Sequence, residues 1–313
     1  MIIKNAIKNQ SYKINFNIDL KKYLNNLIKK YYKVAIITDE NVYKIYKEKI
    51  NIKGLDILRV KPGEKSKSFN VKNSLDEKLL EKKFNRNSLI IGFGGGVVGD
   101  LSGYVAATIL RGIDLVHIPT SLIAIVDSSI GGKTGINSKN GKNLIGSFYN
   151  PREILINSEF INTLSLKEIR QGLSEIIKYG VIKSEKIFNF LEKSNKVFMQ
   201  NHKKNIDKII KECIKIKIDT VEKDFKENDL RSILNFGHTI GHALEKKYSY
   251  KFSHGDCIGT GMAIESLIAN NIYKLSTKNF SRILKLLDKF ELRKVSYKAN
   301  DIENLLDLME LDK

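Results

Sequence analysis

The chain has 313 residues, of which 42% are apolar, and a formal net charge of +19 at pH 7. This length allows one large or two ordinary domains with a real core. The start, MIIKNAIKNQ, has no continuous apolar run, and no stretch reaches membrane-spanning length, so neither a signal peptide nor a membrane span is expected. With only two cysteines, Cys213 and Cys257, a disulfide framework is not expected either, which favours a cytoplasmic protein.

The positive charge has two interpretations. Lysines and arginines could neutralise the phosphates of a nucleic acid, or they could simply form a solvated surface. Here they are spread along the chain among Asn and Ile, and no helix-turn-helix, RNA-binding or zinc-finger pattern occurs. We therefore expect no nucleic-acid partner. A weaker functional interpretation is that the charge steers an anionic small substrate toward the protein.

The first half of the chain alternates strand-like and helix-like segments. Buried strands are expected at residues 33–39, 55–60, 88–93 and 113–119. A helix is expected at 69–84, and another follows the glycine-rich turn after the third of these strands. This alternation predicts a parallel sheet covered by helices, in an α/β, Rossmann-like domain over residues 1–160.

The second half of the chain loses the strand pattern. From about residue 165 its apolar residues recur with helical spacing, which predicts an all-α domain over residues 161–313. The expected helices lie at residues 166–182, 206–223, 230–247, 258–273 and 281–290.

A glycine-rich turn, GFGGGVVGD, follows a predicted strand and opens a predicted helix. Gly94, Gly96 and Gly99 fit the spacing G-x-G-x-x-G, which allows a pyrophosphate to approach the backbone at a helix N-terminus. A tight turn without a ligand is about equally consistent, because the motif does not follow the first strand and has no convincing downstream acid. Asp39, at the end of VAIITD, could hold a ribose hydroxyl or, more commonly, cap the next helix.

A second polar, glycine-rich region covers residues 126–137 and 141–148. Lys133 and Lys142 each follow a glycine, so an ammonium group could reach a phosphate or carboxylate beside open backbone N–H groups. The spacing is not that of a Walker A motif. Two such loops close together favour a functional site over a flexible surface loop.

The segment LNFGHTIGHALE places His238 and His242 four residues apart, on one side of a helix. His254 follows in SHGD, a turn that enters the next helix. Glu175 is an acid on an otherwise apolar helix face, with Lys178 three residues on. Two imidazoles and a carboxylate are the protein ligands of many catalytic zinc sites, although spacing alone does not establish that these three meet.

His117 has a different setting from these three histidines. It lies in the apolar strand DLVHIP. A lone histidine in such a strand is more often a buried, hydrogen-bonded side chain than a ligand, so we expect His117 to be structural.

Seven segments of the chain occur in an order that is typical of one enzyme family. They are PGEKSKS, GGGVVGDLSGYVAATILRG, IPTSLIAIVDSSIGGKTGIN, GKNLIGSFYNP, GLSEIIKYG, LNFGHTIGHALE and SHGD. In this order they resemble the 3-dehydroquinate synthases over nearly the whole chain, from about residue 34 to residue 313. The resemblance implies an α/β domain that binds NAD, a helical domain that carries a metal, and an active site in the cleft.

The resemblance also implies roles for individual residues. Glu175, His238 and His254 would bind one divalent metal, zinc or cobalt, and His242 would be a proton-transfer candidate beside the substrate. The positions that match the family's substrate-binding and catalytic residues are Arg111, Asp127, Lys133, Asn143, Lys178, Lys217, Arg231, Asn235 and His242. The positions that match its NAD-binding residues are Asp39, Asn41, Glu64, Lys67, Gly95, Gly96, Val97, Asp100, Thr120, Ser121, Lys133, Lys142, Phe160 and Thr163.

The implied reaction is that of a lyase in chorismate and aromatic amino-acid biosynthesis. It converts the sugar phosphate 3-deoxy-D-arabino-heptulosonate 7-phosphate into 3-dehydroquinate and phosphate. NAD oxidises the substrate transiently, phosphate leaves by β-elimination, the hydride returns, and an intramolecular aldol step closes the ring. The family also implies a homodimer. The alternatives are another sugar-phosphate cyclase or a metal-dependent polyol dehydrogenase, which would not need the cations Lys133, Lys178, Lys217 and Arg231.

The chain departs from the family pattern in three places. Ser121 stands where Thr is common and keeps the hydroxyl. Before Arg231, Phe225 replaces the usual acid and Asp229 the usual Gly, which leaves the conformation of this loop open. The chain stops at Lys313, within the family's Asp-Lys-Lys motif, and the family's further C-terminal segment is absent. We expect function to be kept without that segment.

Overall fold

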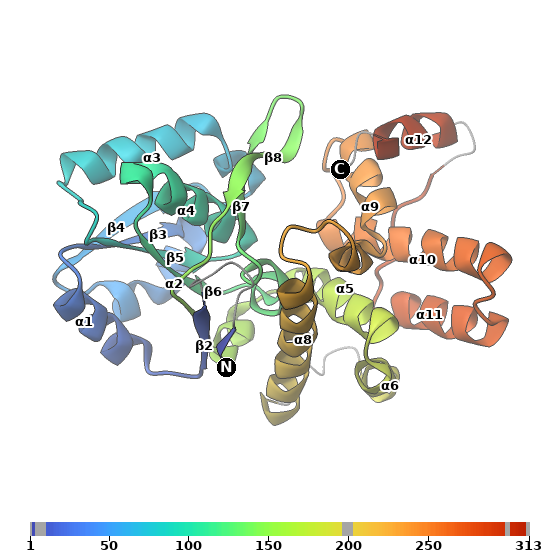
Figure 1. The fold of residues 1–313 in the computed structure, drawn as a ribbon. Helices are drawn as coiled ribbons and strands as arrows, with labels where there is room; N and C mark the ends of the chain where they lie inside the picture. Colours follow the sequence, from blue (N-terminus) through green and yellow to red (C-terminus); the bar gives the residue numbers. More distant parts are fainter. Residues whose placement is uncertain (1, 4–10, 196–202, 298–300, 311–313) are drawn as a thin grey trace. The chain divides into compact units, whose positions relative to one another are not determined.

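The computed structural model divides into two compact units, Met1–Thr163 and Leu164–Lys313 (Figure 1). None of the helices in the described part of the chain is both long and apolar enough to cross a membrane. The described residues are 2–3, 11–195, 203–297 and 301–310. Lys313 lies outside them.

A seven-stranded sheet runs through the first unit. Its strand order is β1-β2-β9-β6-β5-β3-β4, and every neighbouring pair except β1–β2 is parallel. The strands are β1 (Ile2–Ile3), β2 (Tyr12–Phe16), β3 (Val34–Asp39), β4 (Leu55–Val60), β5 (Leu89–Gly94), β6 (Asp114–Pro119) and β9 (Glu153–Ile156). Strands β3, β5 and β6 are buried almost throughout, as expected where helices cover both faces of a parallel sheet.

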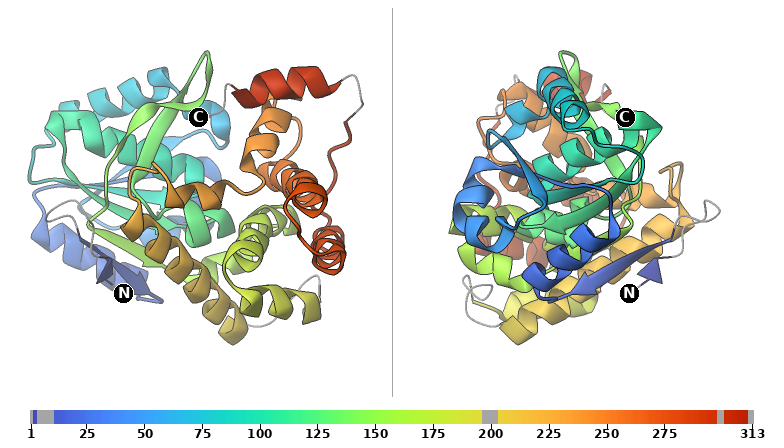
Figure 2. Two further views of the ribbon diagram at one scale, coloured as in Figure 1. Left: turned by 45° about the vertical axis from the view of Figure 1, so that its right-hand side comes forward. Right: turned by 90° about the vertical axis from the view of Figure 1, so that its left-hand side faces the viewer.

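Helices cover both faces of this sheet, as Figure 2 shows from two sides. The helices of the unit are α1 (Leu20–Lys30), α2 (Glu40–Ile50), α3 (Phe69–Glu81) and α4 (Gly96–Thr108). Neighbouring residues of β3 point to opposite faces. Ile37 packs in one core cluster with apolar residues of α3 and α4, whereas Ile36 packs in another with those of α1 and α2.

The sequence-based prediction of this unit is confirmed for the four longest apolar runs. The expected strands appear as β3, β4, β5 and β6, each within one residue of its predicted bounds. The helix expected at 69–84 ends earlier, at Glu81, because Lys83 adopts a left-handed conformation with φ 60°. Strands β2 and β9 and helix α1 were not expected.

The second glycine-rich region forms a hairpin and not the expected loops. Strands β7 (Lys133–Ser138) and β8 (Gly141–Phe148) pair antiparallel in a separate two-stranded sheet. A Cβ on Gly146 would lie 2.0 Å from the Thr134 carbonyl oxygen, and one on Gly135 would lie 2.7 Å from that of Ile145. The glycines therefore allow two backbones to approach each other within a sheet.

The second unit is helical, and its described residues contain no strand. Its helices are α5 (Leu166–Ile182), α6 (Glu185–Lys193), α8 (Lys203–Lys223), α9 (His238–Lys247), α10 (His254–Ile272), α11 (Thr277–Lys289) and α12 (Ile302–Glu310). Cys213 and Cys257 are both buried, and neither forms a disulfide. The two units thus have the α/β and all-α character that the sequence predicts.

The single helix expected over residues 230–247 is broken into two parts. A 3-10 turn, η5 (Leu230–Asn235), comes first, and α9 begins only at His238. Between them Gly237 takes the left-handed conformation, with φ 80°, which favours glycine. This break makes His238 the first residue of α9.

Phe160 offers a test of the first unit's core. Its side chain is fully buried, and its ring centroid lies 5.1 Å from that of Tyr46 and 5.6 Å from that of Phe93. We expect Phe160→Ala to lower the free energy of unfolding by about 3–5 kcal/mol, through lost burial and a residual cavity. Urea unfolding followed by circular dichroism measures this change. Phe69→Ala, at a side chain that is 67% exposed, is the control and should change stability by less than about 0.5 kcal/mol. Equal effects of the two substitutions would contradict this account of the core.

Candidate metal centre and glycine-rich edge

The positions expected to bind the nucleotide gather at one edge of the first unit's sheet. Most of them follow the carboxyl ends of parallel strands, where ligands of open α/β sheets bind. These positions are Asp39 and Asn41 after β3, Glu64 and Lys67 after β4, Gly95, Gly96, Val97 and Asp100 after β5, Thr120 and Ser121 after β6, and Phe160 and Thr163 after β9. Asp39 caps α2, since its carboxylate accepts from the backbone N–H groups of Asn41 and Val42. Phe160 is wholly buried, so its side chain belongs to the core of the unit and is not open to a ligand.

The glycine-rich turn leaves its backbone open. Strand β5 ends at Gly94 and helix α4 begins at Gly96, with no side chain capping the helix. A Cβ on Gly95 would lie 3.2 Å from Ser121 Oγ, and one on Gly96 would lie 3.1 Å from Ser128 Oγ. The turn therefore brings backbone N–H groups and two hydroxyls together at the positive end of a helix dipole, where an anion is stabilised.

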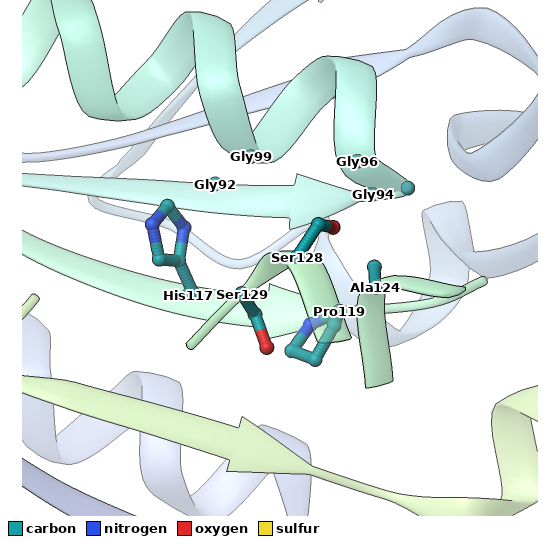
Figure 3. Close-up of a pocket in the computed structure, with 10 residues that line it drawn as sticks. Gly92, Gly94, Gly96, Gly99, His117, Pro119, Ala124, Ser128 and Ser129 are labelled. Atoms are coloured by element: carbon teal, nitrogen blue, oxygen red, sulfur yellow. The ribbon is translucent and has the colours of Figure 1, made fainter. Parts of the chain in front are cut away.

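A small cavity of about 10 Å³ lies behind this turn (Figure 3). His117 faces it and is buried as expected, and burial lowers the pKa of its ring to about 4. The expected hydrogen bond is absent at Nδ1: neither this atom nor Ser129 Oγ has a partner in the described part of the chain. A cavity of this size holds about one water molecule. Its lining residues are Gly92, Gly94, Gly95, Gly96, Gly99, His117, Pro119, Ala124, Ser128 and Ser129.

Lys67 is the centre of a polar cluster at the same edge. Its side chain is only 4% exposed, and its ammonium donates to the Asp100 carboxylate at 2.6 Å and to Asn143 Oδ1. Glu64 Oε1 lies 3.8 Å from the same nitrogen and accepts from Asn137 Nδ2 at 2.8 Å. Burial raises the pKa of Asp100, and Lys67 opposes that rise. The structure thus brings Asn143, expected at the substrate, together with three residues expected at the cofactor.

The remaining polar positions of the first unit fall in two places. Asp127 lies in a π-helical turn after β6, and Lys133 and Lys142 lie on the hairpin β7–β8. The charge of Lys133 also acts to lower the pKa of Asp100. Arg111, in contrast, is exposed and follows the far end of α4. Because a helix of 13 residues spans about 20 Å, Arg111 is not brought to this cluster.

Glu175, His238 and His254 come together in the second unit. One ligand atom from each lies within 4.8 Å of the others, and Glu175 Oε1 lies 3.5 Å from His238 Nε2 and 3.4 Å from His254 Nε2. Ligand atoms of a tetrahedral zinc site, with bonds of about 2.0–2.1 Å, lie about 3.3 Å apart. Glu175 is 1% exposed, and Lys178 forms an ion pair with its Oε2. Neither carboxylate oxygen has a hydrogen-bond partner with acceptable angles among the described residues. The donor set and its spacing therefore fit a divalent metal.

The second ring nitrogen of each histidine has a partner of its own. His238 Nδ1 lies 3.2 Å from the Phe236 carbonyl oxygen, and His254 Nδ1 lies 3.2 Å from Glu245 Oε1. Such contacts fix the direction of an imidazole and leave Nε2 for a metal. Glu245 could not be identified from the sequence, because its role depends on a contact with a residue nine positions away that spacing does not reveal.

The charges of the trio are set by burial and by one another. Burial would raise the pKa of Glu175, but the Lys178 ammonium and the His238 ring outweigh it and hold that pKa well below its usual range. Burial and then Lys178 lower the pKa of His238. Burial also acts to lower the pKa of His254, but contacts with Glu175 and Glu245 outweigh it and raise it to about 10. An ionised carboxylate and a neutral His238 are the forms that bind a metal.

The three ligands come from three helices whose backbones approach at glycines. A Cβ on Gly255, next to His254, would lie 2.7 Å from Gln171 Cα on α5, one turn before the carboxylate ligand. A Cβ on Gly261 of α10 would lie 2.1 Å from the carbonyl oxygen of Gly237. Contacts this short exist only because these residues have no side chain.

His242 lies one turn after His238 on α9. Its ring centroid is 5.4 Å from that of His238 and 6.4 Å from that of His254. Within the described ranges the only group that could hold a metal is Glu175, His238 and His254. His242 is therefore not part of the candidate ligand group, and its expected role in proton transfer remains a prediction.

Three buried cations accompany the metal centre. Lys178 and Arg231 are each 1% exposed and Lys217 is 7% exposed. Their elements, α5, η5 and α8, pack against one another. Asn235, also expected at the substrate, donates from Nδ2 to Glu227 Oε1 at 3.1 Å. The second unit thus brings the three expected cations onto elements that pack against one another.

The loop before Arg231 is held by hydrogen bonds to the side chain of Asp224. The carboxylate of Asp224 accepts from the backbone N–H groups of Arg231 at 3.0 Å, Asn228 at 3.0 Å and Asp229 at 2.8 Å, which lower its pKa to about 2. Asp229 has φ −155°, so this position does not need the family's glycine. Phe225 is buried, and its carbonyl oxygen accepts from Arg231 Nη1 at 2.5 Å. Phe225 and Asp229, the two departures from the family pattern, are therefore both compatible with the conformation of this loop.

Comparison with known proteins agrees with this site. Residues 57–171 match the family described as 3-dehydroquinate synthase N-terminal, and residues 172–313 match 3-dehydroquinate synthase C-terminal. The chain belongs to the 3-dehydroquinate synthase family. It is 43% identical over 312 residues to the 3-dehydroquinate synthase of Dictyoglomus thermophilum, a match that covers 98% of this chain and 86% of that protein.

Two solved structures show the same fold. The complex of 2-deoxy-scyllo-inosose synthase with carbaglucose-6-phosphate, NAD+ and Co2+ superposes with a TM-score of 0.88 at 25% identity, over 100% of this chain and 88% of that one. The 2-epi-5-epi-valiolone synthase of Streptomyces hygroscopicus subsp. jinggangensis, with NAD+ and Zn2+ bound, gives a TM-score of 0.89 at 22% identity, over 98% of this chain and 89% of that one. The expected dehydroquinate synthase-like fold is confirmed.

Gly255 tests how the metal centre is assembled. In Gly255→Ala the new methyl group meets the α5 backbone, so the start of α10 must move away from Glu175. We expect zinc affinity, measured by competition with a chromogenic chelator, to fall about 10- to 100-fold in a protein whose circular dichroism is unchanged. Gly99→Ala is the matched control, because its nearest neighbouring atom is 4.0 Å away. Wild-type zinc affinity in a folded Gly255→Ala variant would contradict the close approach.

Proposed function

We propose that the chain catalyses the 3-dehydroquinate synthase reaction, which converts 3-deoxy-D-arabino-heptulosonate 7-phosphate into 3-dehydroquinate and phosphate. Its cofactors in this proposal are NAD and one divalent metal, zinc or cobalt. The observation that carries the proposal is the convergence of Glu175, His238 and His254 in a chain whose two halves both match this family. The proposal includes a homodimer, which the family resemblance implies, and a cytoplasmic location, which the low cysteine content favours.

The first unit, about residues 1–160, would hold NAD. Gly95, Gly96 and Val97 at the start of α4 would hold its pyrophosphate, since backbone N–H groups and a helix dipole meet there. Asp39 already caps α2 through Oδ1, so binding of a ribose hydroxyl would use its other oxygen. The open backbone at Gly95 and Gly96, where a Cβ would crowd two hydroxyls, fits this assignment.

The second unit, about residues 161–313, would hold the metal and much of the substrate. When bound, NAD accepts and returns a hydride while the metal polarises substrate oxygens. The buried cations Lys178, Lys217 and Arg231 suit a substrate with a carboxylate and a phosphate, because low water content strengthens their attraction for anions. His242, outside the ligand trio, would move a proton beside the substrate.

Phosphate release separates this proposal from its alternatives. We expect the purified chain to release phosphate from 3-deoxy-D-arabino-heptulosonate 7-phosphate with catalytic NAD and zinc, to stop after chelation, and to accumulate no NADH. Stoichiometric NADH would indicate a polyol dehydrogenase instead. A folded protein that binds NAD and zinc without releasing phosphate would indicate another cyclase substrate. Salt-sensitive DNA binding, without NAD or metal binding, would favour a nucleic-acid-binding protein.

The histidines test the ligand assignment. His254→Ala should abolish stoichiometric zinc binding and lower turnover at least about 100-fold, because two ligands do not hold the metal. His242→Ala is the matched control for this variant and should keep one zinc per chain. Its turnover should still fall about 100-fold or more, because general acid–base catalysis typically contributes that much. Elemental analysis of the dialysed proteins gives the zinc content. Zinc retained in the first variant, or lost in the second, would overturn the division of roles.

A further inference from the structure

Helix α9, which begins with the metal-ligand candidate His238, has no cap of its own. The first N–H groups of a helix need an acceptor, usually a side-chain oxygen of the preceding residue. That residue is Gly237, which has no side chain. Helices α5, α10 and α11 differ, because each begins after a serine whose hydroxyl accepts a backbone N–H; these serines are Ser165, Ser253 and Ser276.

Glu265, in the middle of α10, supplies the missing oxygen. The Gly237 N–H donates to Glu265 Oε2 at 2.8 Å, and the Ile240 N–H also acts to lower the pKa of this carboxylate. The other oxygen, Oε1, is buried without a hydrogen-bond partner in the described part of the chain. Burial raises the pKa of Glu265 to about 7, which the two N–H groups oppose. The carboxyl group of Glu265 therefore acts as the N-terminal cap of α9.

Capping from α10 constrains the metal site at two points. Gly237 directly precedes His238, and the Phe236 carbonyl oxygen, which lies 3.2 Å from His238 Nδ1, belongs to the residue before it. Anchoring Gly237 therefore anchors both the backbone of the ligand and the partner of its ring. Because Glu265 and His254 share one helix, the same contact ties the start of α9 to the helix that carries another ligand.

We propose that Glu265 is a positioning residue for the metal centre: from α10 it caps α9 and so directs His238 toward Glu175 and His254. This inference rests on the proposed metal site. It adds a residue that is neither a ligand nor one of the expected substrate or cofactor positions. A carboxyl group at a helix N-terminus is also electrostatically favourable when it is ionised.

Two substitutions separate the acceptor oxygen from the bulk of the side chain. Glu265→Gln keeps an oxygen that can accept from the Gly237 N–H group, whereas Glu265→Met keeps the length and removes the acceptor. We expect zinc affinity to fall about 10- to 100-fold in the Met variant and to stay within about threefold of wild type in the Gln variant. In the metal-free proteins, amide hydrogen exchange at residues 237–240 should be about tenfold faster or more in the Met variant only, because loss of a cap frays the helix.

Ser276→Ala is the matched control. It removes the cap of α11, where Ser276 Oγ accepts from the Asn279 N–H at 3.2 Å, and should leave zinc affinity unchanged. Should the Met variant not fold, Glu265→Ala, which removes the acceptor without bulk, carries the same expectation. Wild-type zinc affinity and exchange in a folded variant without the acceptor would overturn the positioning role. Absence of zinc binding by the wild-type chain would overturn the metal centre itself, and with it this inference.

Discussion

The buried charge of Glu175 is the constraint on which the helical unit depends. A carboxylate removed from water costs free energy unless cations or donors surround it. Here the ammonium of Lys178 comes from the same helix, while the two imidazoles come from α9 and α10. Three helices must therefore converge to stabilise one charge, so the contacts that assemble this unit are also the contacts that would hold a metal.

In the α/β unit the buried charge is a cation, and the topology of the sheet brings its partners together. Its polar side chains gather because parallel strands end at one edge, and the buried ammonium of Lys67 is stabilised there by Asp100 and Asn143. In the proposed reaction this unit would carry the electrons and the helical unit the Lewis acid. Removing NAD or the metal separately would then tell a defect in one half of the chemistry apart from a defect in the other.

Much of this organisation could be predicted from the sequence. Strands β3 to β6 are six-residue segments rich in apolar residues and can be recognised without a structure, whereas β9 has only four residues and β2 is polar at alternate positions. The ligand trio could be proposed only through the order of motifs, since the spacing of Glu175 from the histidines carries no signal. The roles of Glu245, Asp224 and Glu265 could not be predicted, because each depends on a contact made after folding.

The glycine contacts among α5, α9 and α10 bear on metal selectivity. Where Gly255 meets Gln171, and Gly261 meets Gly237, no side chain lies between the backbones and none can change rotamer to open or close the gap. An ion of larger radius must then be accommodated by a tilt of whole helices, at the expense of packing along their length. The site would discriminate between ions by the stiffness of its scaffold as well as by the chemistry of its ligands.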